Sequence, residues 1–221
     1  MITRALIILN VLAFLWEIKT AGPGMLSPMG TDSELSVLQA GALWPASVLV
    51  GHEWWRIFTS AFLHAGLLHI FVNMFSLWSL GRFVEAVAGS WRMALIYLVS
   101  LIASGLGVIY LSAPADAMTP TLGASGAIFG VFGALFAMGL KLGPRGMQLV
   151  RANLGILIIN LIFTFSVHTI SWQAHVSGLV AGFLFTLLIY FPPRPVAPVV
   201  TDAVTGSQYE TEYQTPHPPE S

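Results

Sequence analysis

Long runs of apolar residues, separated by short polar stretches, dominate most of the chain. Six of these runs approach or reach the length of about 17 to 25 residues that a membrane-spanning helix needs. They lie at Ile2–Ile18, Leu67–Phe83, Trp91–Leu111, Ser125–Leu140, Asn153–Ile170 and Trp172–Phe191. We therefore predict an all-α membrane protein built as a bundle of six transmembrane helices. The fourth run is short if it begins at Ser125, which indicates a helix that starts below the membrane surface.

The composition favours a membrane environment. Of the 221 residues, 56% are hydrophobic and 9% are charged, whereas soluble domains carry about 25% charged residues. A soluble fold with so few charges could not cover its surface, so the lipid bilayer is the expected solvent. The net charge of −1 and the lack of a basic stripe argue against a nucleic-acid partner. The absence of Cys excludes a disulfide framework, a thiol nucleophile and a cysteine-ligated metal.

The basic residues predict the orientation of the spans. With alternating connections, most of the nine Lys and Arg residues fall on one side of the membrane: Arg4, Arg82, Arg92, Lys141, Arg145, Arg151 and Arg194. The other side receives Lys19 and Arg56. Because short cytoplasmic connections are enriched in Lys and Arg, both termini should be cytoplasmic.

The two ends of the chain differ in character. The segment from Met1 to Ile18 combines one Arg with an apolar run, as a secretory signal peptide also does. It has no clear small-x-small cleavage site, so a retained first helix is the simpler interpretation. After Phe191 the chain is Pro-rich without apolar periodicity, which predicts a disordered cytoplasmic tail. We expect a six-helix membrane domain over residues 1–192 and this tail over residues 193–221.

Two connections carry structural information. The first, from Lys19 to Gly66, is long and rich in aromatic residues (Trp44, Trp54, Trp55 and Phe58), which suits an element lying in the membrane interface. The second, Ala113–Leu122, contains two prolines and several turn residues. It predicts a non-helical entry to the fourth helix.

Ser125 and His175 are polar residues at depths where polar groups must face protein or water. Ser125 begins the fourth run within a G-x-S-G sequence, where it could be a simple helix N-cap. It lies about 24 Å of helix from Lys141, and His175 lies about 28 Å from Arg194, so the two side chains could match in depth. Small-residue faces follow both, with Gly126, Gly130 and Gly133 on one helix and Gly178 and Gly182 on the other. Such faces permit close helix approach, in a hydrolase or in a transporter.

His69 and Asn73 form a second polar feature. They are four residues apart, share a helix face and could both donate hydrogen bonds to one point, as an oxyanion requires. A zinc site is the alternative, but His64 and His69 are expected to point about 140° apart on a helix, with no clear carboxylate ligand nearby. We therefore predict no metal. His168, beside the short turn before the last run, is interpreted as a structural residue at the membrane interface.

These motifs together resemble the rhomboid family of intramembrane serine proteases. The resemblance is carried, in chain order, by Trp55-Arg56, the H-x4-H-x3-N sequence of His64, His69 and Asn73, Glu85, the G-x-S-G sequence around Ser125, and A-H-x-x-G-x3-G from Ala174 to Gly182. A single G-x-S-G would be weak support, whereas the ordered set on the expected helices is specific. The six predicted helices are similar to the minimal bacterial type of the family.

The resemblance implies a catalytic Ser–His dyad without an acidic third member. Ser125 would be the nucleophile and His175 the general base and then acid. His69, Asn73 and the backbone N–H of Ser125 would form the oxyanion hole. No cofactor would be needed. The substrates would be transmembrane segments of membrane proteins, cleaved in a bacterial plasma membrane.

The resemblance also assigns supporting roles. These fall on His64, Phe129, Gly123 and Gly126. Many family members have Tyr one turn after the nucleophile, stacked on the catalytic His, whereas this chain has Phe129. The stacking would survive this difference, but a hydroxyl contact would not.

Four alternatives compete with this reading. A non-proteolytic relative would lack the Ser or the His, and both are present. A transporter or channel would place charged groups along a path through the bundle, and no span has one in its middle. A metalloprotease would need H-E-x-x-H, but His52-Glu-Trp-Trp-Arg56 ends in Arg. An aspartyl protease would need two Asp residues within spans, where there are none.

Overall fold

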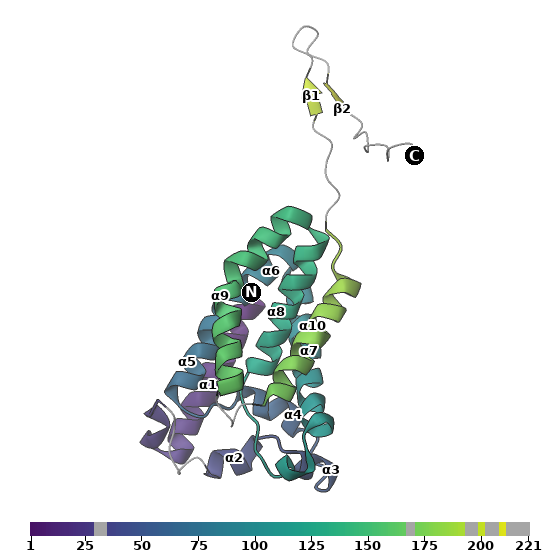
Figure 1. Ribbon diagram of the computed structural model, residues 1–221. Helices are drawn as coiled ribbons and strands as arrows, with labels where there is room; N and C mark the ends of the chain where they lie inside the picture. The colour runs from purple at the N-terminus through teal and green to yellow at the C-terminus, as the bar shows by residue number, and fades with distance from the viewer. Residues whose placement is uncertain (29–34, 167–170, 193–198, 202–207, 211–221) are drawn as a thin grey trace. The chain divides into compact units, whose positions relative to one another are not determined.

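The predicted apolar runs fold as the long helices of a bundle. A computed structural model describes residues 1–28, 35–166, 171–192, 199–201 and 208–210. Its long helices, drawn in Figure 1, are α1 (Ile2–Ala21), α7 (Ser90–Leu111), α8 (Ser125–Lys141), α9 (Gly143–Ser166) and α10 (Trp172–Ile189). The second predicted run forms α5 (Leu67–Ser76), the π-helical turn η4 (Leu77–Gly81) and α6 (Arg82–Ala88) in succession.

Length and apolar character identify membrane-spanning candidates among these helices. Within the described residues, three stretches are long and apolar enough to cross a membrane: Leu67–Ala88, Ser90–Leu111 and Trp172–Ile189. Two shorter apolar helices cover Ser125–Lys141 and Gly146–Ile162. The prediction of a helical, multi-pass membrane protein is thus confirmed, and the number of six spans stays a prediction.

α9 departs from its predicted boundary. It begins at Gly143, whereas the apolar run predicted a start at Asn153. Gly143 has a φ of +65°, so the chain turns directly from α8 into α9. Pro144 then occupies the first turn, where its fixed φ suits a helix. The polar residues before the apolar run are therefore helical as well, which an apolar pattern could not reveal. The predicted end of this run and His168 lie outside the described residues.

The first connection folds into a series of short helices. They are η1 (Pro23–Leu26), α2 (Leu35–Gly41), α3 (Pro45–Leu49), α4 (Arg56–Thr59) and η3 (Ser60–Phe62). Figure 1 shows α2, α3 and α4 together at the end of the bundle away from α6. The predicted non-helical entry to α8 contains one 3₁₀ turn, η5 (Pro114–Asp116), and its Thr121 pairs with Leu43 of the first connection in an isolated β-bridge.

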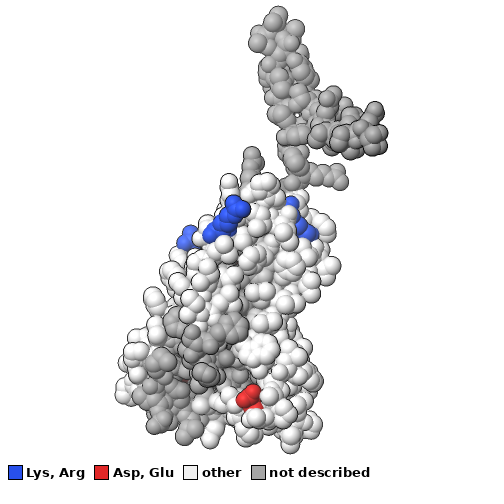
Figure 2. Space-filling view, in the orientation of Figure 1, with Lys and Arg blue, Asp and Glu red and all other residues white. Residues whose placement is uncertain are grey.

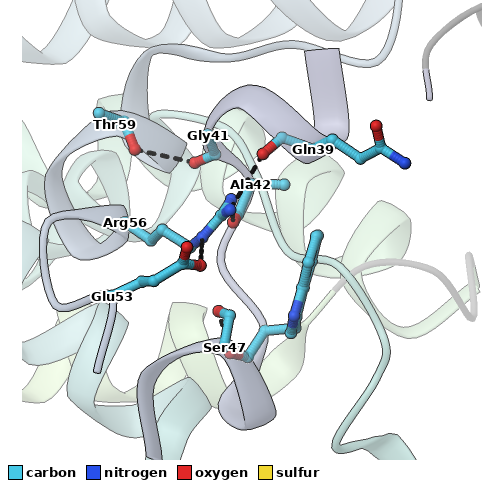
Figure 3. A network of polar contacts seen from close by, with 8 residues as sticks. Gln39, Gly41, Ala42, Ser47, Glu53, Arg56 and Thr59 are labelled. Atoms are coloured by element: carbon cyan, nitrogen blue, oxygen red, sulfur yellow. Dashed lines mark hydrogen bonds and ion pairs between the residues drawn. The ribbon is translucent and has the colours of Figure 1, made fainter. Parts of the chain in front are cut away.

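Arg56 ties this connection together from within (Figure 3). Its Nη1 and Nη2 donate to the carbonyl oxygens of Ala42 and Gln39 at 2.9 and 3.0 Å, and its Nε pairs with Glu53. The guanidinium also lies over the rings of Trp44 and Trp55, at 4.9 and 4.5 Å from their centroids. Although Arg56 is buried, its charge is thus fully engaged, which holds the short helices in one arrangement.

α8 and α10 pack closely and contact each other through glycine. A methyl group at Gly178 would lie 2.0 Å from the carbonyl oxygen of Gly126, and one at Gly182 would lie 2.0 Å from that of Gly130. No Cβ fits at these distances, so the two backbones are in direct contact along this face. At the other end of the pair, Lys141 Nζ donates to the carbonyl oxygen of Tyr190 at 2.6 Å. The two helices therefore run in the same direction.

We expect Gly178→Ala to destabilise the protein by about 1–3 kcal/mol, because the added methyl must push α10 away from α8. The thermal unfolding midpoint in detergent measures this effect. Gly155→Ala in α9 is the matched control, since a Cβ there meets nothing within 4 Å and Ala favours a helix. Equal midpoints for Gly178→Ala and the wild type would contradict the close α8–α10 contact.

The chain divides into two compact units, Met1–Tyr190 and Phe191–Ser221. Most of the second unit lies outside the described residues, so its predicted disorder stays a prediction. Its described residues include β1 (Val199–Thr201) and β2 (Gln208–Glu210), which pair antiparallel with Val200 opposite Tyr209.

Candidate active site

Ser125 and His175 meet where α8 and α10 both begin. Ser125 Oγ lies 2.7 Å from His175 Nε2, although the two residues are 50 positions apart. His175 is 5% exposed and sits in the first turn of α10, whose N-cap Ser171 accepts a hydrogen bond from the Ala174 N–H. The glycine contact between the two helices makes this short distance possible. The arrangement can support nucleophilic attack with general-base assistance.

Ser125 does not act as a helix N-cap. Ala124 occupies that position, Ser125 is the first helical residue, and no side chain caps α8. The hydroxyl of Ser125 is engaged with His175 instead. The alternative that the sequence left open for this serine is therefore wrong.

Phe129 packs against the face of His175. The two rings are stacked, with centroids 4.2 Å apart and planes inclined by 11°. Phe129 lies one turn after Ser125 in α8 and is fully buried, with 1% of its surface exposed. The stacking restrains the imidazole plane so that its Nε2 edge faces Ser125.

His69 and Asn73, both on α5, bring two N–H donors beside Gly123. The Ala65 N–H donates to His69 Nδ1 at 3.2 Å, so in neutral His69 the proton sits on Nε2. Asn73 is buried, and its Nδ2 has no hydrogen-bond partner among the described residues. A buried donor without a partner is costly, unless a ligand atom satisfies it during function.

Gly123 shapes the space between these donors and Ser125. Its φ is +116°, and a methyl group there would lie 2.8 Å from His69 Nε2 and 3.7 Å from Asn73 Nδ2. Its N–H donates to the Ser60 carbonyl at 2.8 Å, which anchors the loop to η3. Only glycine combines this backbone conformation with contact against the His69 ring.

His64 lies behind His69. It precedes α5 and is not helical, so the expected divergence of the two histidines on a helix is wrong. Their rings touch edge to face with centroids 5.1 Å apart. Its N–H donates to Glu17 Oε2 at 3.1 Å, and burial, reinforced by His69, lowers its pKa well below the usual value. His64 thus packs against the back of His69 as a neutral ring. Within the described residues, no group of three His, Asp or Glu side chains could hold a metal ion.

A cavity of about 410 Å³ joins these groups. Its walls include Ser125, His175, His69, Asn73, Ser104 and Asn160, drawn from five helices. The cavity is large enough for several water molecules or an extended stretch of polypeptide. Ser125, His175 and the two donor residues therefore line one cavity.

The comparison with known families decides the membership. The family model of the Rhomboid domain matches residues 51–191, which contain Ser125, His175, His69 and Asn73. The chain belongs to the rhomboid family. Rhomboid protease GluP of Bacillus subtilis is 35% identical over 169 residues, covering 76% of this chain and 32% of GluP. RHOMBOID-like protein 1 of Arabidopsis thaliana is 31% identical over 175 residues, covering 76% of this chain and 43% of that protein.

The relatives include one whose name marks it as inactive. Inactive RHOMBOID-like protein 8 of Arabidopsis thaliana is 34% identical over 112 residues, covering 50% of this chain and 30% of that protein. The matched region spans less than half the length of each of these three relatives. Membership of the rhomboid family therefore does not by itself establish activity, and the geometry of the site has to carry that argument.

Glu85 of the rhomboid domain stabilises the start of α1. Its carboxylate accepts hydrogen bonds from the N–H groups of Ile2 and Thr3 at 2.7 and 3.0 Å, and from Ser90 Oγ at 2.6 Å. The first N–H groups of a helix have no partner within it and favour negative charge. Glu85 therefore caps α1 from α6, away from the cavity.

Two residues of this rhomboid site were missed by the sequence reasoning. Thr164 of α9 lies 2.7 Å from His175 Nδ1 through its Oγ1. Glu17 of α1 is fully buried, and its carboxylate accepts a hydrogen bond from the His64 N–H. An acidic residue near the end of an apolar run is a detectable signal for Glu17. Thr164 offers no such signal, because Thr is common in membrane helices.

Proposed function

We propose that this chain is an intramembrane serine endopeptidase that cleaves transmembrane segments of membrane proteins. The observation that carries the proposal is the 2.7 Å contact between Ser125 Oγ and His175 Nε2 inside a cavity that also holds free donor groups. The name of Rhomboid protease GluP supports the same reaction class, and the presence of both Ser and His separates this chain from a relative that has lost either.

In the proposed reaction, His175 Nε2 takes the hydroxyl proton as Ser125 Oγ attacks the peptide carbonyl carbon. The carbonyl oxygen becomes an oxyanion, stabilised by His69 Nε2–H, the Asn73 amide and the Ser125 backbone N–H. The C–N bond then breaks, and His175 returns the proton to the leaving amine. Water then attacks the carbonyl carbon of the remaining ester while His175 Nε2 removes one of its protons. The bond between this carbon and Ser125 Oγ breaks, His175 passes the proton to Ser125 Oγ, and the carboxyl product leaves.

The proposed substrate class rests on the proposed position of the site within the bilayer. A peptide bond within a helix is shielded by its own hydrogen bonds, so the segment must unwind locally before attack. Substrates with small or helix-breaking residues near the membrane surface would unwind most easily. The open cavity around Ser125 would receive such an extended stretch.

The membrane topology belongs to the same proposal. We place six spans in a bacterial plasma membrane, with α1, α5–α6, α7, α8, α9 and α10 as the crossing elements and both termini in the cytoplasm. On the face seen in Figure 2, basic side chains gather at the end of the bundle nearest α6, as the enrichment of cytoplasmic connections in Lys and Arg would require. The dyad would then lie towards the outer leaflet.

Labelling with a serine-directed fluorophosphonate tests the proposal without a known substrate. We expect the full chain in detergent micelles to be labelled, and Ser125→Ala and His175→Ala to give no label above background. Ser112→Ala, at the end of α7 and outside the cavity lining, is the matched control and should label like the wild type. An unlabelled wild type, or a labelled Ser125→Ala variant, would reject the assignment.

A further inference from the structure

The second ring nitrogen of His175 also has a defined partner. Thr164 Oγ1, on α9, lies 2.7 Å from His175 Nδ1. Thr164 is buried, with 4% of its surface exposed, so no bulk solvent competes for this contact. The imidazole is therefore held at three places: at Nε2 by Ser125, at its face by Phe129 and at Nδ1 by Thr164.

The direction of the Thr164–His175 hydrogen bond follows from a third contact. Thr164 Oγ1 donates its only hydrogen to the carbonyl oxygen of Asn160, one turn earlier in α9, at 2.7 Å. A backbone carbonyl can only accept, so the Thr164 hydroxyl is committed as a donor there. Its oxygen lone pairs then face His175, and Nδ1 must carry the proton that joins the two groups.

We propose that Thr164 is a positioning residue that holds His175 in the Nδ1–H tautomer, which leaves Nε2 free to accept the proton of Ser125. The inference rests on the proposed function, because this tautomer matters only if His175 acts as a base. The Asn160 carbonyl, Thr164, His175 and Ser125 then form one chain of hydrogen bonds that all point the same way. The opposite tautomer would put a hydrogen on Nε2 and disable the base.

The same contact serves the charged intermediate. When Nε2 takes the proton from Ser125, the Nδ1–H bond of the imidazolium continues to donate to Thr164 Oγ1, and no proton passes to Thr164. A hydrogen bond to a charged donor is stronger than one to a neutral donor, so the contact favours the imidazolium over the resting state.

The place of Thr164 is in turn set by α9 and its neighbour. Asn160 Nδ2 donates to the Ile156 carbonyl at 2.8 Å and to Ser76 Oγ of α5 at 3.3 Å. The contact between Asn160 and Ser76 fixes this turn of α9 against α5, the helix that also carries His69 and Asn73. The helix that positions His175 through Thr164 is therefore bonded to the helix that carries His69 and Asn73.

A structural role is the competing interpretation, since Thr side chains in membrane helices often bond to the carbonyl four residues earlier and do nothing else. The two interpretations predict different effects when the Thr164 hydroxyl is replaced by a methyl group. Loss of a purely helical contact would change stability alone, whereas loss of the Nδ1 partner would change the tautomer and the rate of attack.

The test compares Thr164→Val with Thr164→Ser in the full chain, by the second-order rate of fluorophosphonate labelling. We expect Thr164→Val to label about tenfold more slowly, as the loss of one neutral hydrogen bond implies, and Thr164→Ser to stay near the wild-type rate. Thr186→Val is the matched control, because Thr186 is fully buried in α10 and its hydroxyl has no partner among the described residues. It should label at the wild-type rate.

A nitrogen-15 spectrum of the wild-type imidazole provides a second readout, independent of whether Thr164→Val folds. Neutral His175 is expected to be protonated at Nδ1 and unprotonated at Nε2. A mainly Nε2–H imidazole, or equal labelling rates for Thr164→Val and Thr164→Ser, would overturn the inference while leaving the dyad intact. An unlabelled wild type would instead reject the proposed function itself.

Discussion

Replacing either Ser125 or His175 by Ala should lower the rate of cleavage of a transmembrane substrate by about 10⁶-fold. In the proposed mechanism, Ser125 supplies the nucleophile and His175 removes its proton, so neither group is effective without the other. Their 2.7 Å contact makes them one unit. We therefore expect the double variant to be no slower than either single one, because members of a catalytic unit are strongly non-additive. The measurement is the initial rate of product formation in lipid vesicles.

Two controls make this result interpretable. Ser112→Ala and His52→Asn alter a Ser and a His outside the cavity lining, and Asn tolerates the positive φ of 58° found at His52. Both controls should cleave at the wild-type rate, and all variants should keep the wild-type unfolding midpoint within a few degrees. If the fold loss in cleavage rate of the double variant equalled the product of the two single losses, Ser125 and His175 would act separately, contrary to the geometry.

Replacing His69 or Asn73 by Ala should lower the turnover number by about 10² to 10³-fold, the loss typical of one oxyanion donor. Both donors lie beside Gly123, and the Asn73 amide has no other partner among the described residues. In the proposed mechanism, their hydrogen bonds become strong only when the oxyanion forms. The loss should therefore appear in kcat with little change in KM. Steady-state kinetics on the same substrate separate the two constants.

Asn153→Ala provides the matched control for this pair. Its Nδ2 donates to the Leu149 carbonyl within α9, and it does not line the cavity. It should leave both constants unchanged. If His69→Ala and Asn73→Ala raised KM and left kcat unchanged, these residues would bind substrate in its ground state and would not form an oxyanion hole.

The pattern of the sequence was sufficient for the class of protein. Apolar runs with few charges can be stable only as membrane helices, so the helical multi-pass architecture followed from composition and run length. The ordered motifs around His69, Ser125 and His175 identified the family, which the match over residues 51–191 confirms. Helix boundaries that depend on turns were harder to predict: α9 starts at Gly143 because one glycine reverses the chain, whereas the apolar run predicted a start at Asn153.

Only the tertiary structure decided which side chains touch. Gly126 and Gly178 lie in different helices, and their contact brings Ser125 to His175 at hydrogen-bond distance. The glycine pattern allowed this pairing without requiring it. The choice of Thr164 as the partner of Nδ1 depends on the rotation of α9 about its axis. Such choices arise because a hydrogen bond forms only within about 3 Å and in a narrow range of angles. Residue type and spacing along one helix do not specify those geometries between helices.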